Sequence, residues 1–162
     1  MAPDPEAEAE AEAQLARHAD RLADAVDVVL PGWVERSVGR RLPSVSPAVR
    51  RAAEDAGRRA GAEIGGAVRA LLATDVDAQR GNPLALLRRA VRYPTEVLLE
   101  AGAPAVARDE YSMERFPDDD YDLTPATWSD IDPSLQELGL TWGAAKAYVH
   151  KARHRPSGGG GT

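Results

Sequence analysis

The chain has 162 residues, of which 43% are hydrophobic, and its formal net charge at pH 7 is −6. It contains no cysteine, which excludes disulfide frameworks, thiol catalysis and cysteine-ligated metal centres. No apolar run approaches the roughly 18 residues of a membrane span, and the N-terminal residues are acidic, unlike a secretory signal, so we expect a cytoplasmic protein.

The length and the apolar composition together predict one helical domain. The chain has one Phe, four Tyr and three Trp, so its core must be built mainly from Leu, Val and Ala, which suits closely packed helices. We therefore predict an all-α fold, a single compact domain of about five to seven helices over residues 14–155. A flexible acidic extension is expected at residues 1–13 and a flexible glycine-rich tail at residues 156–162.

Charge is distributed in four blocks along the chain. Residues 1–34 carry two Arg and eight acids, residues 35–92 carry twelve Arg and six acids, residues 93–142 carry two Arg and twelve acids, and the last twenty residues carry four bases and no acid. This alternation favours attraction between segments of the chain, or toward a partner of opposite charge.

The first predicted helix begins at Leu15. Its apolar residues follow the three- and four-residue spacing of one helical face; they are Leu15, Ala19, Leu22, Val26 and Val29. We expect this helix to stop at Pro31-Gly32 and to pack on its own domain, with dimerisation as the alternative. A short helix is predicted after it, ending before Pro43.

The next predicted helix starts with Ser46 as N-cap and Pro47 in the first turn, and its apolar residues keep helical spacing for about six turns. Gly57, Gly61 and Gly65 lie on one line of this helix. Since each helical Gly costs about 1 kcal/mol relative to Ala, we attribute them to close packing of another helix of the same chain. A self-association face or a stripe without a role are the alternatives.

Shorter helices with proline starts follow. One is predicted from Asn82-Pro83 to Tyr93-Pro94, one from there to Gly102, and one from Pro104 to Pro117. Thr124-Pro125 and Asp132-Pro133 are further predicted helix starts. A basic helix with the sequence "TWGAAKAYVHKARHR" is predicted at the end of the domain.

The segment "RFPDDDYDLTPATWSDIDPS", residues 115–134, holds six aspartates and no base after Arg115. Six of the eight aromatic residues lie between Tyr111 and Tyr148, so we expect an ordered acidic loop held by buried rings. We predict a non-enzymatic interaction or regulatory protein that presents this surface to a basic partner protein. The candidate partner-binding residues are Phe116, Asp118, Asp119, Asp120, Tyr121, Asp122 and Trp128.

No metal, cofactor or catalytic residue is predicted. The aspartate run lacks the central Gly and terminal Glu of a calcium loop. His150 and His154 have helical i,i+4 spacing, but no third ligand is evident and the neighbouring residues are basic, so we expect them to be exposed helix residues. Rossmann, P-loop and nucleophile-elbow patterns are absent from the sequence.

Nucleic-acid or ribonucleoprotein binding is the alternative function. Lys146, Lys151, Arg153 and Arg155 of the last helix, together with the Arg-rich block, could contact phosphates. The overall pI of about 5.1 weighs against this alternative.

The run from "NPLALLRRAVRYPTEVLLEAG" to "TWSDIDPSL", followed by "WGAAKAYVHKAR", resembles a small family of uncharacterised actinobacterial proteins. The resemblance covers residues 30–155 and implies no activity, cofactor or site residue.

Overall fold

The structure is a computed structural model that describes residues 4–154. Within this range the chain forms six continuous helical segments and no strand, which confirms the predicted all-α class. The elements are α1 (Pro5–Arg40); α2 (Pro47–Ala60) with the π-helical turn η1 (Gly61–Gly65) and α3 (Gly66–Ala73); α4 (Pro83–Arg88) with the 3-10 turn η2 (Arg89–Val91) and α5 (Arg92–Glu100); α6 (Glu110–Arg115); α7 (Trp128–Ile131); and α8 (Ser134–Arg153). The predicted tail at residues 156–162 lies outside the described residues.

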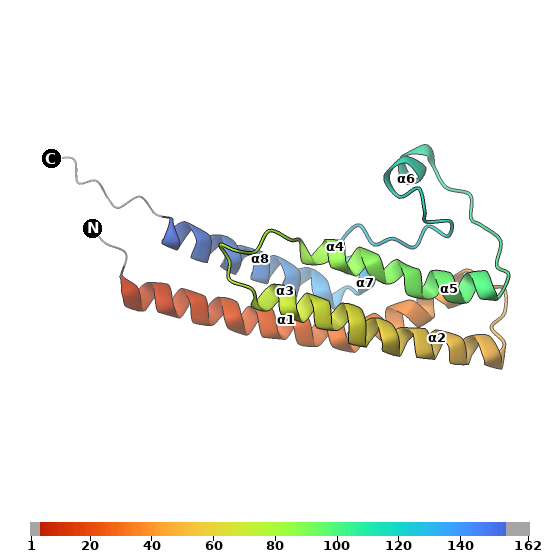
Figure 1. The fold of residues 1–162 in the computed structure, drawn as a ribbon, viewed down its shortest axis with the longest axis horizontal. Helices are drawn as coiled ribbons and strands as arrows, with labels where there is room; N and C mark the ends of the chain where they lie inside the picture. The colour runs from red at the N-terminus through yellow and green to blue at the C-terminus, as the bar shows by residue number, and fades with distance from the viewer. Residues whose placement is uncertain (1–3, 155–162) are drawn as a thin grey trace.

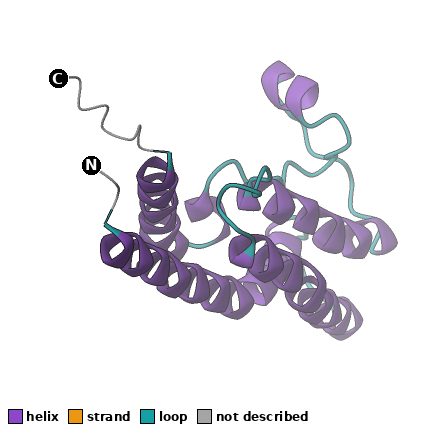
Figure 2. Ribbon diagram, turned by 60° about the vertical axis from the view of Figure 1, so that its left-hand side comes forward, coloured by secondary structure: helices purple, strands orange, loops and turns teal. Residues whose placement is uncertain are grey.

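The helices form an elongated bundle along α1 (Figure 1). The α2–α3 segment returns antiparallel to α1, and α8 also runs back along it, so the start of α1 and the end of α8 lie at the same end of the molecule (Figures 1 and 2). The segment that carries α6 projects from the bundle near the opposite end (Figure 1). No helix in the described part of the chain is long and apolar enough to cross a membrane.

α1 begins earlier than the sequence analysis predicted. Asp4 caps the helix by accepting a hydrogen bond from a backbone N–H, and a proline occupies the first turn. Residues 5–13, expected to form part of a flexible extension, are therefore helical. Ala11 is buried against Val76 and Val149, and these contacts join residues too far apart in sequence for a local pattern to reveal.

The predicted helix stop at Pro31-Gly32 is wrong, because α1 continues through the proline to Arg40. A proline inside a helix costs about 3 kcal/mol. The buried stripe of α1 nevertheless extends on both sides of it and includes Leu22, Val26, Leu30, Trp33, Val34 and Val38. Since burial of one large apolar side chain contributes about 1.5–3 kcal/mol, the burial of Trp33, Val34 and Val38 offsets the cost of the proline.

The glycine stripe packs against α1, as predicted. A Cβ atom on Gly57 would lie 2.9 Å from the Pro31 carbonyl oxygen, and one on Gly65 would lie 2.5 Å from Asp27 Oδ1. Gly61 faces the ring of Pro31. The preferred interpretation, close packing within the chain, is thus confirmed, and the π-helical turn spans the last two glycines of the stripe.

Several predicted helix boundaries are confirmed. Ser46 accepts a hydrogen bond from the Val49 N–H at 3.2 Å, and Asn82 caps α4 in the same way. Gly102 follows α5 with a φ of +73°, the left-handed conformation that glycine adopts readily at a helix end. Asp132 accepts hydrogen bonds from the N–H and hydroxyl of Ser134 at the start of α8.

Three other predicted boundaries are wrong. The helix expected from Pro104 begins only at Glu110, after the N-cap Asp109. No helix starts at Thr124-Pro125, since α7 begins at Trp128 behind the N-cap Thr127. The expected break at Tyr93-Pro94 falls inside the continuous α4–α5 segment, because a proline in the first turn of α5 sacrifices no hydrogen bond that the helix needs.

Candidate functional site

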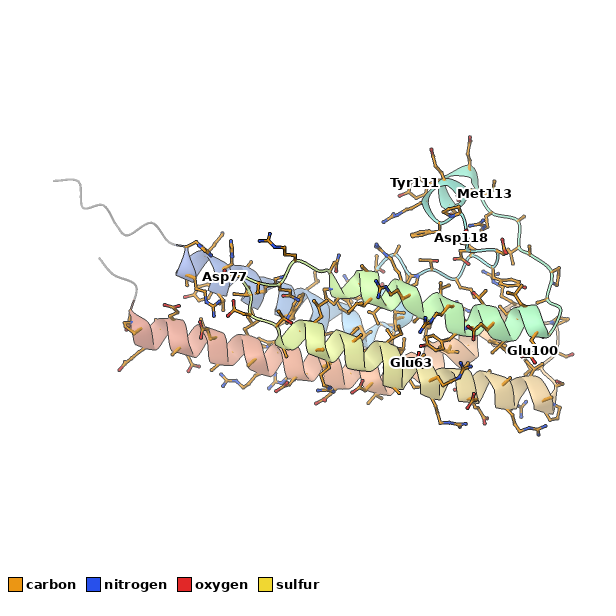
Figure 3. All side chains as sticks on the ribbon, in the orientation of Figure 1. Glu63, Asp77, Glu100, Tyr111, Met113 and Asp118 are labelled. Carbon is orange, nitrogen blue, oxygen red and sulfur yellow. The ribbon has the colours of Figure 1, made fainter. Side chains whose placement is uncertain are left out.

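Residues 103–127 form an arm that projects from the helical bundle (Figures 1 and 3). The arm contains seven acidic residues and two arginines. Its only helix, α6, has no buried residue, and Tyr111 and Met113 on that helix are 66% and 51% exposed. Figure 3 places both side chains at the tip of the arm, away from the bundle. The arm therefore offers an aromatic ring and a thioether to solvent within an acidic field.

Hydrogen bonds to backbone carbonyl groups hold the arm together. The arm has an outgoing limb before α6 and a returning limb after it. The Val106 N–H donates to the Asp120 carbonyl at 2.9 Å, so the two limbs lie side by side. Arg108 donates to the Phe116 carbonyl at 2.6 Å. The Tyr121 hydroxyl donates to the Ala103 carbonyl at 2.8 Å. These contacts make the projecting segment an ordered loop, because they join residues from both of its limbs.

Asp119 organises the returning limb from inside. Its carboxylate accepts hydrogen bonds from the N–H groups of Tyr121, Leu123 and Thr124 and from the Thr124 hydroxyl, at distances of 2.7–3.3 Å. The residue is only 5% exposed, and these donors replace the water that the charge has lost. Asp119 and the buried Tyr121 thus hold the loop together, and neither presents a free side chain to a partner.

Arginines of the bundle hold the acidic segment by its backbone. Arg36 of α1 donates to the Ile131 carbonyl at 3.2 Å, and Arg88 of α4 donates to the Pro125 carbonyl at 3.2 Å. By contrast, the carboxylates of Asp118, Asp120 and Asp122 take part in none of the ion pairs formed within residues 4–154. The fold therefore secures the segment while leaving those three charges exposed to solvent.

The two remaining candidate residues have different surroundings. Phe116 is half-buried, with the Arg115 guanidinium 5.2 Å from its ring centroid. It shares with Asp118 and Arg88 a concavity of about 340 Å³ between the arm and α4. Trp128 is half-buried against α8, where a Cβ on Gly139 would lie 2.5 Å from the indole nitrogen. Phe116 thus remains beside the exposed acids, whereas Trp128 packs on the bundle.

Tyr111 and Met113 are absent from the site residues that the sequence analysis predicts. Both belong to the helix expected from Pro104, and a helical pattern alone favours a packing role for such side chains. Residues two positions apart do not share one face of a helix, so a helix as short as α6 cannot bury both side chains on a single neighbour. That spacing is the signal that could have identified them, together with prolines on both sides of the helix.

The basic helix of the alternative function is engaged by acids. The Arg153 guanidinium binds Glu12 at 2.5 Å, Asp75 at 2.8 Å and Asp77 at 3.2 Å. These carboxylates raise its pKa, with the hydrogen bond to Glu12 as the largest cause. Lys146 lies 5.2 Å from the Trp142 ring centroid, and Arg155 lies outside the described residues. The sequence predicts a free basic surface on this helix. In the structure, carboxylates of the same chain neutralise the charge of Arg153.

A cavity of about 300 Å³ lies near this end of the bundle, among α1, α3 and α8. Apolar residues such as Leu15 and Leu72 line it, and Glu12, Asp75 and Arg153 stand at its charged side. Because Glu12 and Asp75 both bind Arg153, the cavity offers no unpaired charge from Arg153 to an anionic ligand.

Searches of protein-family models, curated proteins and solved structures returned no match for this chain.

Proposed function

We propose that this protein is a non-enzymatic interaction or regulatory protein that uses its arm to bind a basic surface of a partner protein. One observation carries the proposal: within residues 4–154, the tip helix α6 has no buried residue, and the carboxylates of Asp118, Asp120 and Asp122 form no ion pair. The proposed binding residues are Tyr111, Met113, Phe116, Asp118, Asp120 and Asp122. The proposal retains a cytoplasmic location, which a cysteine-free composition favours.

The chemistry of these residues suits recognition of a basic surface. Exposed carboxylates attract a positively charged partner over about one Debye length, which raises the rate of encounter. A Tyr or Phe ring and a Met side chain supply apolar contact area once the partner has arrived, and Met adapts to irregular surfaces. Charge on the arm thus steers the partner, and Tyr111, Met113 and Phe116 anchor it.

The nucleic-acid alternative receives no comparable support. The charge of Arg153 is neutralised by carboxylates of the same chain, and the acidic arm would repel a polyphosphate backbone.

The test compares two double charge reversals that change the net charge equally. Asp118→Lys with Asp120→Lys alters the arm, and Glu35→Lys with Glu54→Lys alters exposed acids of α1 and α2 that join no ion pair within residues 4–154. Asp119 is left intact because its replacement would disrupt the loop. Each protein is used to capture partners from native lysate at low salt, with and without nuclease treatment, and the affinity of each recovered protein is then measured.

We expect the arm variant to lose at least about tenfold in affinity for a stoichiometric partner, and the control variant to bind as the wild type does. Tyr111→Ala should weaken the same interaction with little change in its salt dependence, since it removes contact area and no charge. Equal binding by the two charge-reversal variants would refute the arm as the binding surface. Recovery of partners only without nuclease would favour the nucleic-acid alternative.

A further inference from the structure

Far from the arm, the fold brings two histidines and an aspartate together. Asp77 lies in the loop between α3 and α4. His150 lies in the last turn of α8, and His154 is the C-cap residue that follows the helix. His150 Nδ1 is 3.1 Å and His154 Nε2 is 2.8 Å from the same oxygen, Asp77 Oδ1. All three potential ligand atoms lie within 4.8 Å of one another. Figure 3 shows Asp77 at the end of the bundle opposite the arm.

We propose that Asp77, His150 and His154 form a binding site for a divalent transition-metal ion, with Zn²⁺ as its best-suited occupant. Zinc is bound by imidazole nitrogen and carboxylate oxygen at about 2.0–2.2 Å, and tetrahedral geometry then places the ligand atoms roughly 3.3 Å apart. The oxygen-to-nitrogen distances in the cluster are already close to this value. Both rings are exposed on one helical face, so small side-chain rotations complete the approach to a common ion.

The electrostatic objection raised by the sequence does not hold in the folded protein. The residues next to the histidines along the chain are basic, but Asp75 and Glu12 come from other segments and bind Arg153. With Asp77 included, three carboxylates surround that single guanidinium, and this surplus of negative charge favours a cation. The site therefore depends on acids that only the tertiary structure brings to α8.

Arg153 also prepares the aspartate for metal binding. Its guanidinium contacts Asp77 Oδ2 at 3.2 Å, while both histidines face Oδ1. Arg153 thus orients Asp77 through Oδ2, and Oδ1 is left facing the proposed ion. Metal-binding side chains are commonly oriented in this way by a neighbouring residue that does not itself bind the metal.

Three protein ligands leave a fourth tetrahedral position for water or an external donor. The ligands are exposed, so an ion can exchange with solvent without opening the core. A bound ion would join the loop between α3 and α4 to the last turn of α8. Nitrogen donors favour zinc over calcium and magnesium, which prefer oxygen ligands.

The experiment is calorimetric titration of Zn²⁺ into the full chain, without a metal-binding tag and after removal of metal by a chelator. We expect one ion per chain. His150→Ala, His154→Ala and Asp77→Asn should each weaken binding by at least the tenfold to hundredfold that loss of an outer-shell partner typically costs. His18→Gln is the matched control, since it replaces the third histidine of the chain, on α1, and should leave the affinity unchanged. Mg²⁺ should give no saturable binding.

Far-ultraviolet circular dichroism of each variant shows whether it is folded, and visible absorption of bound Co²⁺ reports the ligand set independently of calorimetry. The Co²⁺ spectrum should change in all three ligand variants and stay the same in His18→Gln. The proposal is overturned if the wild type shows no 1:1 zinc binding tighter than about 0.1 mM. It is equally overturned if the folded ligand variants bind zinc as the wild type does.

Discussion

At the scale of single residues, Gly57 decides how closely α2 can approach α1. A methyl group at this position would lie 2.9 Å from a backbone oxygen, that of Pro31, and backbone cannot rotate away as a side chain can. Gly66, further along the same continuous helix, has open space where a methyl group would stand, with no neighbouring atom within 4 Å. Alanine substitution at Gly57 and at Gly66 therefore distinguishes the effect of a steric clash from the general cost of glycine in a helix.

We expect Gly57→Ala to reduce the free energy of unfolding by about 1–3 kcal/mol, the usual cost of overpacking. Gly66→Ala should increase it by about 0.5–1 kcal/mol, because alanine restricts the unfolded chain and favours the helix. Urea denaturation of both variants measures these changes. Stabilisation by both substitutions would show that the close approach at Gly57 is absent.

Asp119 is the second residue whose role is decided by its surroundings. Asp119→Ala would leave the N–H groups of Leu123 and Thr124 without their acceptor, and an unsatisfied buried donor costs about 1–3 kcal/mol. We expect faster hydrogen exchange throughout residues 119–125, measured by mass spectrometry. Asp118→Ala, which removes an exposed neighbour, should leave exchange in this segment unchanged, and similar exchange in the two variants would contradict the internal role of Asp119.

At the scale of elements, α8 depends on Asp132 at its start. The hydroxyl of Ser134, followed by its N–H, lowers the pKa of the Asp132 carboxyl below its ordinary value. A carboxyl whose pKa is lower in the folded than in the unfolded state stabilises the fold above its unfolded pKa. That contribution is lost as the pH falls through the folded pKa.

Asp132→Ala should therefore lower the thermal unfolding midpoint at pH 7, by roughly the 2–4 °C typical of a lost cap in a domain of this size. The difference from the wild type should begin to shrink as the pH falls below about 4, the ordinary pKa of an Asp carboxyl, and should vanish once the pH is below the lowered pKa of the folded protein. Thermal melts at a series of pH values measure this. A difference that stays constant down to about pH 3 would mean that the ionised cap is not its cause.

At the scale of the whole molecule, Arg153 connects segments from three parts of the chain. Its guanidinium binds Glu12 of α1 and Asp75 and Asp77 of the loop after α3, and its side chain is only 20% exposed. The start of α1 is thus held by charge as well as by the burial of Ala11.

We expect Arg153→Gln to increase hydrogen exchange in residues 5–13 by about tenfold, through local opening of that end of the bundle. Exchange in the arm should stay at the wild-type rate, because the arm lies at the other end. Lys151→Gln, close by in sequence and exposed, is the control and should leave residues 5–13 protected. Equal protection in the wild type and Arg153→Gln would show that apolar burial alone holds the start of α1.

The sequence by itself determined the all-α class, the caps at Ser46 and Asn82, the start of α8 next to Asp132-Pro133, and the glycine stripe that faces a neighbouring helix. These features rest on helical periodicity and on hydrogen bonds between residues a few positions apart, so a local pattern contains them. Only the tertiary structure decided that α1 continues through Pro31, since that depends on burial against other helices. It also placed Asp77 beside His150, 73 residues away in sequence, and buried Asp119 while its neighbours stayed exposed. Packing between distant segments decides these outcomes, because burial and charge pairing depend on which residues meet in space.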